Sequence, residues 1–195
     1  GPYITGGMMV ARHPDTGVET GGFHRLQIKG PRKMGCSLHS RRRMFHYQRL
    51  YEERGENMPA AICLGLHPLV LMGFLSYPPP EVSKFRACGG VFGEPMEIAR
   101  CAGLDLHVPA WSEIVIEGEF LAGAREPEGP FGEFTGYFSA RSTEHVFRVH
   151  CVSMRESPWF QSIASGQAGD HRTTSGLIRE AEVRNALRRS IPGVK

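Results

Sequence analysis

Residues 106–137, LHVPAWSEIVIEGEFLAGAREPEGPFGEFTGY, carry the densest strand, turn and glycine signals of the 195-residue chain. Their first half, Ser112–Phe120, is rich in β-branched residues that alternate with acidic ones, which predicts a β-strand. One face of that strand would hold three glutamates and a valine, so at least one carboxylate should lie in partly enclosed space. An unpaired charge there is costly. That carboxylate therefore needs a basic partner or a metal ion.

The second half of this stretch, Glu126–Tyr137, interleaves glycines and prolines with three aromatic residues. Such a run cannot form a helix, and it suits a tight loop whose glycines let the backbone approach a ligand closely. An ordinary, well-packed surface loop has the same composition. The composition by itself leaves both interpretations open.

The composition of the whole chain indicates one soluble globular domain, with 41% hydrophobic and 22% charged residues. The formal charge of +3 is too small to suggest nucleic-acid binding. The basic residues at 32–33 and 41–43 form a local patch that a phosphate-sized partner would suffice to explain. No apolar stretch approaches the length of a membrane span, and the N-terminal residues lack the layout of a signal peptide.

Five cysteines are scattered through the chain without a CxxC pair. An odd number without paired spacing fits reduced thiols better than disulfides or a zinc framework. We therefore expect a cytoplasmic protein. The sequence also lacks the spacings typical of zinc proteases, dinucleotide folds, P-loops and serine hydrolases.

Strands are expected to outnumber helices, and the β-rich N-terminal segments should form a hairpin or meander. The expected strands are Tyr3–Val10, Gly21–Ile28, Ala60–Leu66, Lys84–Val91, Met96–Arg100, Ser112–Phe120 and His145–Arg155. The expected helices are Met44–Arg54, Pro68–Leu75 and Glu180–Arg189. This order has neither regular βαβ units nor the rhythm of a sandwich, so it predicts an antiparallel or mixed barrel with peripheral helices.

The motif VPAWSEIVIEGE and the following PEGPFGEFTGY resemble the signature of the UbiD-like decarboxylases. These enzymes use prenylated FMN (prFMN) to remove or add carboxylates on unsaturated and aromatic acids. The resemblance continues through GPYITGG, HPDTG, GGFHRLQIKGPRKMG and ACGGVFGEPMEIARC upstream, and through GDHRTTSGLIREAEVRNALRRSIPGV downstream. It covers nearly the whole chain.

The resemblance implies a fold that is mixed α/β and mainly β, a split β-barrel of flavin-reductase type with peripheral helices. Family members have three parts, and residues 1–195 match the middle one, which holds the cofactor. We therefore expect a single domain that lacks the N-terminal and C-terminal parts. A carboxylic acid would be the substrate, and a second copy or a partner subunit would supply the missing C-terminal part.

The resemblance also assigns residues to the cofactor and the substrate. In GGFHRLQ it places Gly22, Phe23 and His24 at the cofactor and matches Arg25 to an arginine that contacts the flavin and the substrate carboxylate. A guanidinium suits that task because it is always charged and binds carboxylates with two hydrogen bonds. An outward-facing strand arginine is the alternative. The resemblance also places Arg42, next to the family's metal-binding histidine position, among the cofactor-binding residues, together with Arg43 and Glu117.

Glu117 matches the metal-binding glutamate of the family, where manganese clamps the cofactor phosphate. The other two ligand positions differ, because Thr20 replaces an asparagine and Arg43 replaces the histidine. One carboxylate and one hydroxyl beside an arginine make a poor divalent site. We therefore expect no tightly bound manganese or zinc and regard potassium as doubtful. Arg43 could neutralise a phosphate directly or pair with Glu117. We expect it to fill the metal position and pair with Glu117.

Asp170 falls where many members have a glutamate that protonates the product. Aspartate is one methylene shorter, so proton delivery would need a shifted geometry. A turn or helix-capping role is the alternative for this residue.

The sequence leaves two functions open. The first is the catalytic core of a non-oxidative (de)carboxylase that acts through prFMN. The second is a non-catalytic flavin-binding or assembly subunit with a degenerate metal site.

Overall fold

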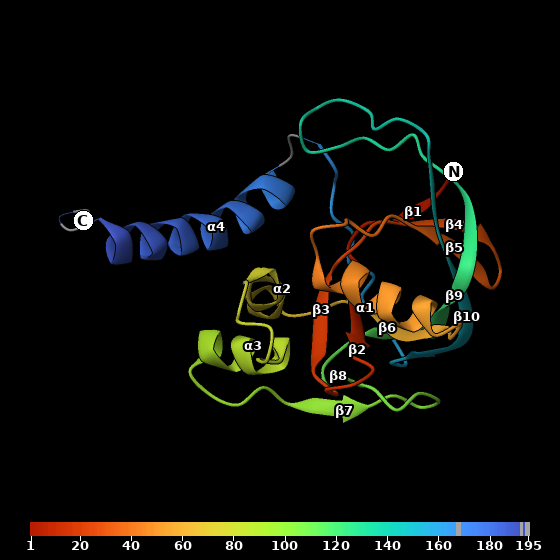
Figure 1. Ribbon diagram of the computed structural model, residues 1–195, viewed down its shortest axis with the longest axis horizontal. Coiled ribbons are helices and arrows are strands. Elements are labelled where there is room, and N and C mark those ends of the chain that lie inside the picture. The colour runs from red at the N-terminus through yellow and green to blue at the C-terminus, as the bar shows by residue number, and fades with distance from the viewer. Residues whose placement is uncertain (167–168, 192, 194–195) are drawn as a thin grey trace.

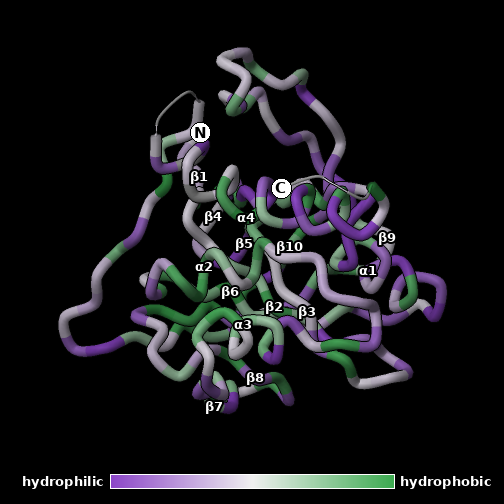
Figure 2. The backbone as a smooth tube through the Cα atoms, turned by 90° about the vertical axis from the view of Figure 1, so that its left-hand side faces the viewer, coloured by the Kyte–Doolittle hydropathy of each residue, from purple (hydrophilic) through white to green (hydrophobic). Residues whose placement is uncertain are grey.

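The strands β2 (Met8–Arg12) and β6 (Met58–Leu64) are buried on both faces. Met9 and Ile62 face a core that includes α1 (Arg43–Glu53). Val10 and Cys63 face a second core beneath the helices α2 (Pro68–Leu75) and α3 (Lys84–Phe92). Burial on both faces explains why these strands are continuous apolar runs without alternation. In Figure 2 the hydrophobic residues accordingly gather along α2, β2 and β6.

The computed structural model describes residues 1–166, 169–191 and 193. The other strands are β1 (Tyr3–Ile4), β3 (Glu19–Phe23), β4 (Leu26–Gly30), β5 (Lys33–Cys36), β7 (Ile98–Arg100), β8 (His107–Pro109), β9 (Ile114–Glu128) and β10 (Ser142–Met154). Eight strands form an antiparallel sheet in the order β1-β4-β5-β10-β9-β6-β2-β3, and β7 pairs with β8. The fold is therefore mixed α/β and mainly β, as expected. Within the described residues β1 and β3 remain edge strands, so the sheet is not a closed barrel.

The helices lie around this sheet, and α4 (Gly169–Ser190) projects from the body in Figure 1. α2 packs against both α3 and α4. α2 has the bounds expected from the sequence, and α1 differs from its expected range by one residue at each end. The predicted helix Glu180–Arg189 is the second half of α4. None of the helices in the described ranges combines the length and hydrophobicity needed to cross a bilayer.

The prediction of a strand at Lys84–Val91 was wrong, because these residues form α3. Its start is capped by Ser83, whose hydroxyl accepts a hydrogen bond from the Phe85 amide at 3.3 Å. Its end is capped by Gly93 in the left-handed conformation, with φ 79°. These two capping signals outweigh the short alternation of apolar residues that suggested a strand.

The ribbon of β9 and β10 is longer than the sequence predicted and forms one wall of the molecule in Figure 1. β9 continues through residues 121–125 into the segment expected to be a loop, and it ends at Glu128. Register shifts at 145–147 and 149–151 of β10 interrupt the pairing. Bulges of this kind bend a ribbon. The loop 129–141 then joins the two strands.

His145 on β10 is a buried, neutral histidine that should make stability depend on pH. Its Nε2 lies 3.0 Å from the side-chain oxygen of Gln48, and burial lowers its pKa to about 4. The unfolded chain, with a histidine pKa of about 6.5, therefore takes up this proton first as the pH falls. The associated stability is complete above pH 6.5 and is lost toward pH 4, on the order of 3 kcal/mol.

We expect His145→Gln to unfold in urea with a smaller loss of stability between pH 6.5 and 4 than the wild type. His24 is buried and has its pKa lowered to about 4 as well, so a part of the loss should remain. An identical pH slope in variant and wild type would contradict the prediction.

Candidate functional site

A pocket of about 650 Å³ lies between the β3–β4 connection, the 74–82 segment that joins α2 to α3, the loop after β9 and the start of α4. It combines aromatic and aliphatic walls with a few charged groups, the usual composition of a ligand site. The pocket brings together most of the residues predicted from the sequence. Those that line it are Thr20, Gly22, Phe23, His24, Arg25, Arg42, Arg43 and Asp170.

Arg25, in the short connection from β3 to β4, is held between two glutamates. Its Nε and Nη2 donate to the two carboxylate oxygens of Glu128, at 3.0 and 2.8 Å, and its Nη1 donates to Glu133. The ring of Phe131 lies against the guanidinium, with its centroid 5.0 Å from Cζ. A two-point ion pair and a stacked ring fix the plane of the guanidinium. Burial alone would lower the pKa of Arg25, but the hydrogen bond to Glu128 raises it.

Glu128 is completely buried at the last position of β9, opposite Ser142 of β10. The next residue, Gly129, has φ 91°, a conformation that favours glycine, and a Cβ there would lie 3.1 Å from the Ala140 carbonyl oxygen. The strand therefore ends directly after Glu128, whose carboxylate stays inside. Burial and the neighbouring Glu128 raise the pKa of the Tyr3 hydroxyl to about 12.

Glu133 is the more accessible of the two carboxylates, since its side chain is 33% exposed and lines the pocket. A turn fixes its backbone: the Glu133 amide donates to the Tyr137 carbonyl at 2.8 Å, and the Gly136 amide donates to the Glu133 carbonyl at 3.0 Å. Glu128 already balances the charge of Arg25. Glu133 is therefore the carboxylate that can exchange a proton with a ligand in the pocket.

His24 lines the pocket and is 8% exposed. Its Nδ1 is 3.4 Å from the carbonyl oxygen of Ser37. Burial lowers the pKa of His24 to about 4, so the ring is neutral at pH 7. It can present a hydrogen-bonding nitrogen to a ligand without adding charge.

The expected ion pair between Arg43 and Glu117 is not formed. Glu117 is 1% exposed and accepts hydrogen bonds from the amides of Ala102, Gly103 and Leu104, at 2.7, 2.8 and 3.1 Å. Three backbone donors satisfy a buried carboxylate as well as a cation would. Glu117 does have a partner, but that partner is the loop before β8, and Glu117 is not among the residues that line the pocket.

Arg43, at the first position of α1, donates instead to the carbonyl oxygens of Pro79 at 2.7 Å and Val82 at 3.1 Å, and to that of Pro78. The pair between Arg43 and Glu117 was inferred only from the positions of these residues in the sequence. Those positions could not show that the amides of residues 102–104 bind Glu117. Among the described residues, no group of three histidine, cysteine or acidic side chains is placed to hold a metal ion.

Asp170 lines the pocket at the first turn of α4, and its carboxylate accepts a hydrogen bond from the Ala164 amide at 2.8 Å. A carboxylate at a helix N-terminus is favourably placed for such a local contact. The role of Asp170 as a proton donor stays a prediction. Glu133, which contacts Arg25 in the same pocket, is the better-positioned carboxyl group.

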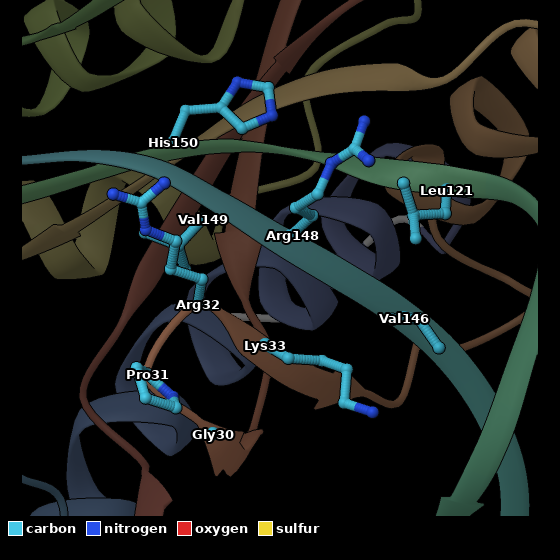
Figure 3. Close-up of a pocket in the computed structure, with 9 residues that line it drawn as sticks. All are labelled: Gly30, Pro31, Arg32, Lys33, Leu121, Val146, Arg148, Val149 and His150. Atoms are coloured by element: carbon cyan, nitrogen blue, oxygen red, sulfur yellow. The ribbon is translucent and has the colours of Figure 1, made fainter.

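A second hollow of about 540 Å³ lies between the β4–β5 turn and the β9–β10 ribbon (Figure 3). Its lining consists of Gly30, Pro31, Arg32, Lys33, Leu121, Val146, Arg148, Val149 and His150. It contains no carboxylate among its lining residues, and Arg148 and His150 both contact Glu119 beside it. This hollow therefore lacks the acid–base pair that distinguishes the first pocket.

Glu128 and Glu133 were not recognised in the sequence as site residues. They occupy both ends of EGPFGE, a segment that was interpreted only as a glycine-rich loop. A usable signal was present, because two carboxylates flank glycine, proline and phenylalanine in a loop able to approach a ligand closely. What the sequence could not show is that the loop places both within reach of Arg25, about a hundred residues earlier in the chain.

Comparisons with known proteins show what this chain is similar to. A family model described as 3-octaprenyl-4-hydroxybenzoate carboxy-lyase Rift-related domain (UbiD) matches residues 1–168. Anhydromevalonate phosphate decarboxylase of Methanothermobacter thermautotrophicus is 32% identical over 100% of this chain and 45% of its own length. Phenolic acid decarboxylase of Bacillus subtilis is 34% identical over 85% of this chain and 36% of its own length.

Among solved structures, an evolved dimeric form of the UbiD-class enzyme HmfF from Pelotomaculum thermopropionicum, in complex with prFMN, superposes with a TM-score of 0.94. It is 34% identical, and the match covers 98% of this chain and 44% of that protein. The chain thus spans less than half the length of each of these three proteins.

Proposed function

Because the chain belongs to the UbiD carboxy-lyase family, we propose that it is the cofactor-binding domain of a non-oxidative (de)carboxylase that acts on an unsaturated or aromatic carboxylic acid through prFMN. The observation that carries this proposal is the Arg25–Glu128–Glu133 cluster at the wall of the pocket. Residues 1–195 would form one domain, the middle of three, and its sheet would be the split β-barrel of flavin-reductase type that the family resemblance implies.

The pocket fits a flavin mononucleotide in both volume and charge. A volume of about 650 Å³ lies within the range of ligand pockets. Phe23 and Phe131 provide apolar walls for a ring system, and the basic side chains Arg41, Arg42 and Arg43 provide charge for a phosphate. In contrast, Glu117 is occupied by backbone amides, so the residues present do not fit a divalent metal site.

In the proposed reaction, Glu128 fixes Arg25 at the end of the pocket that receives the acid group of the substrate, and Glu133 transfers the proton. Prenylated FMN, when bound, supplies the electron sink for the electron pair left by the departing carbon dioxide. The bond from carbon to the carboxylate breaks, carbon dioxide leaves, and Glu133 delivers a proton to that carbon. A proton from solvent then restores Glu133. Phe131, packed on both Arg25 and Tyr3, excludes water from this end of the pocket.

The test is to load the purified chain with prFMN and to supply a phenolic acid in D₂O. We expect carbon dioxide release with one deuterium placed on the carbon that carried the carboxylate. A non-catalytic flavin-binding or assembly subunit is the alternative, which Thr20 and Arg43 at the family's metal-ligand positions favour. Tight prFMN binding without any deuterium incorporation would support that alternative.

We also propose that the domain assembles with a second copy or a partner subunit and works in the cytoplasm. Apolar side chains stay exposed along α4 at Leu177, Val183 and Leu187, just after it at Ile191, and on the α2–α3 side at Leu69 and Tyr77. All five cysteines are free, which is consistent with a reducing compartment. Exposed apolar faces of this kind favour association. Light scattering should therefore show a species larger than the monomer, and a strict monomer at high concentration would contradict this.

A further inference from the structure

A buried lysine and a half-buried arginine fill a cluster of main-chain oxygens at the edge of the flavin pocket. Lys84, 7% exposed at the start of α3, donates to the carbonyl oxygens of Phe74 at 2.8 Å and Ser76. Arg43 donates to those of Pro78, Pro79 and Val82. All five carbonyls belong to residues 74–82, which comprise the end of α2 and the connection to α3. Both cations line the pocket.

A cluster of carbonyl oxygens is the kind of surroundings that a hard metal cation occupies in proteins. Here an ammonium and a guanidinium, both covalently part of the chain, take that place. Burial lowers the pKa of Lys84 to about 8, and the nearby Arg43 lowers it as well. The lysine nonetheless remains mostly protonated at pH 7. Two like charges so close together are costly unless an anion balances them.

The donors of these groups are not exhausted by the carbonyls. Within the described residues, Lys84 uses two of its three N–H groups and Arg43 uses donors on only its two Nη atoms. Arg42, one residue before Arg43, lies with Cζ 4.9 Å from the ring of Tyr77, and the Lys84 ammonium lies 5.4 Å from the same ring. Two cations, Arg42 and Lys84, therefore lie against one aromatic ring at the pocket edge.

The acidic groups near this cluster are too few to neutralise it. Asp170 and Glu133 are the acidic residues of the described pocket lining, and Glu133 is engaged with Arg25. Glu182 of α4 lies outside the lining, where its carboxylate accepts from the Tyr77 amide at 2.6 Å. The edge of the pocket thus carries an excess of positive charge, which an anionic ligand group would balance.

We propose that Lys84, Arg43 and Arg42 form a phosphate site in which side-chain cations take the place of metal ions, and that it holds the phosphate of the flavin cofactor. This inference rests on the proposed function. It assigns the task of neutralising the phosphate to residues of this chain, with no divalent ion required. It also gives Lys84, which the sequence motifs did not single out, a direct part in cofactor binding.

The test compares FMN with riboflavin, which differ by the phosphate, using quenching of flavin fluorescence by the 195-residue chain. The wild type should bind FMN more tightly, and an excess of EDTA should leave that affinity unchanged. Inorganic phosphate should compete with FMN and not with riboflavin. Lys84→Met and Arg43→Met should each weaken FMN binding roughly 10- to 100-fold, the range expected for a charge-assisted hydrogen bond, with riboflavin binding unchanged.

Lys84→Arg should restore most of the FMN preference, because it keeps the charge. Arg86→Met is the matched control, since Arg86 is a basic, exposed residue of the same helix. If Lys84 and Arg43 only hold the 74–82 segment, their loss would weaken both flavins equally, and that result would overturn the inference. Equal affinity of the wild type for FMN and riboflavin, or loss of FMN binding in EDTA, would overturn the phosphate-site inference but not the proposed function. Binding of neither flavin would overturn the proposed function too.

Discussion

Replacing Glu133 with glutamine is expected to slow carbon dioxide release by the prFMN-loaded protein about 10²- to 10⁴-fold, the usual contribution of a positioned acid or base. Glutamine keeps the size and the hydrogen-bonding shape of the side chain but cannot donate the proton that the product carbon needs. The turn at Glu133 is held by its backbone, so the loop should keep its conformation. The charge of Arg25 also stays balanced, because Glu128 remains in place.

The experiment compares turnover with cofactor binding in the same variant. In Glu133→Gln the affinity for FMN should be unchanged, and deuterium incorporation should fall in parallel with carbon dioxide release. Asp170→Asn is the informative companion, since Asp170 is the proton donor that the family resemblance suggested. Should Asp170→Asn abolish turnover while Glu133→Gln stays active, the assignment of the acid would move to α4.

The fold could be predicted where a single strong local signal decides the element. Pro68 at the first position of α2 and the prolines after it fix that helix at both ends. The apolar run at β6 predicts a buried strand, because few other elements are that short and that apolar. Lys84–Val91 failed because two capping residues outside the segment, Ser83 and Gly93, decide its conformation.

The candidate site could be predicted only in part, for a different reason. Residues close together in sequence, such as 21–25 of the GGFHRLQ motif, do reach one pocket. The partner of each charge could not be inferred, because partners lie far apart in the chain. Glu117 was expected to need a cation, yet it finds three amides of a neighbouring loop, and Arg25 finds two glutamates across the sheet.

The buried ion pair between Arg25 and Glu128 leads to the largest expected effect on stability. Arg25→Met should destabilise the protein by about 3 to 5 kcal/mol, the usual cost of leaving one member of a buried ion pair without its partner. Glu128 is 0% exposed, and within the described residues both of its oxygens are bonded to Arg25. Methionine fills a similar volume without a charge, so the loss would come mainly from the stranded carboxylate.

Urea unfolding at pH 7 measures this effect, and two further variants separate charge from packing. Arg100→Met breaks the ion pair with Asp105, whose side chains are 73% and 72% exposed, and should cost only about 0 to 1 kcal/mol. Adding Glu128→Gln to Arg25→Met removes the stranded charge and should recover a large part of the stability. Equal losses from Arg25→Met and Arg100→Met would show that the interior around Glu128 admits water. Glu128 could not then hold Arg25 rigidly enough to position Glu133 for proton transfer.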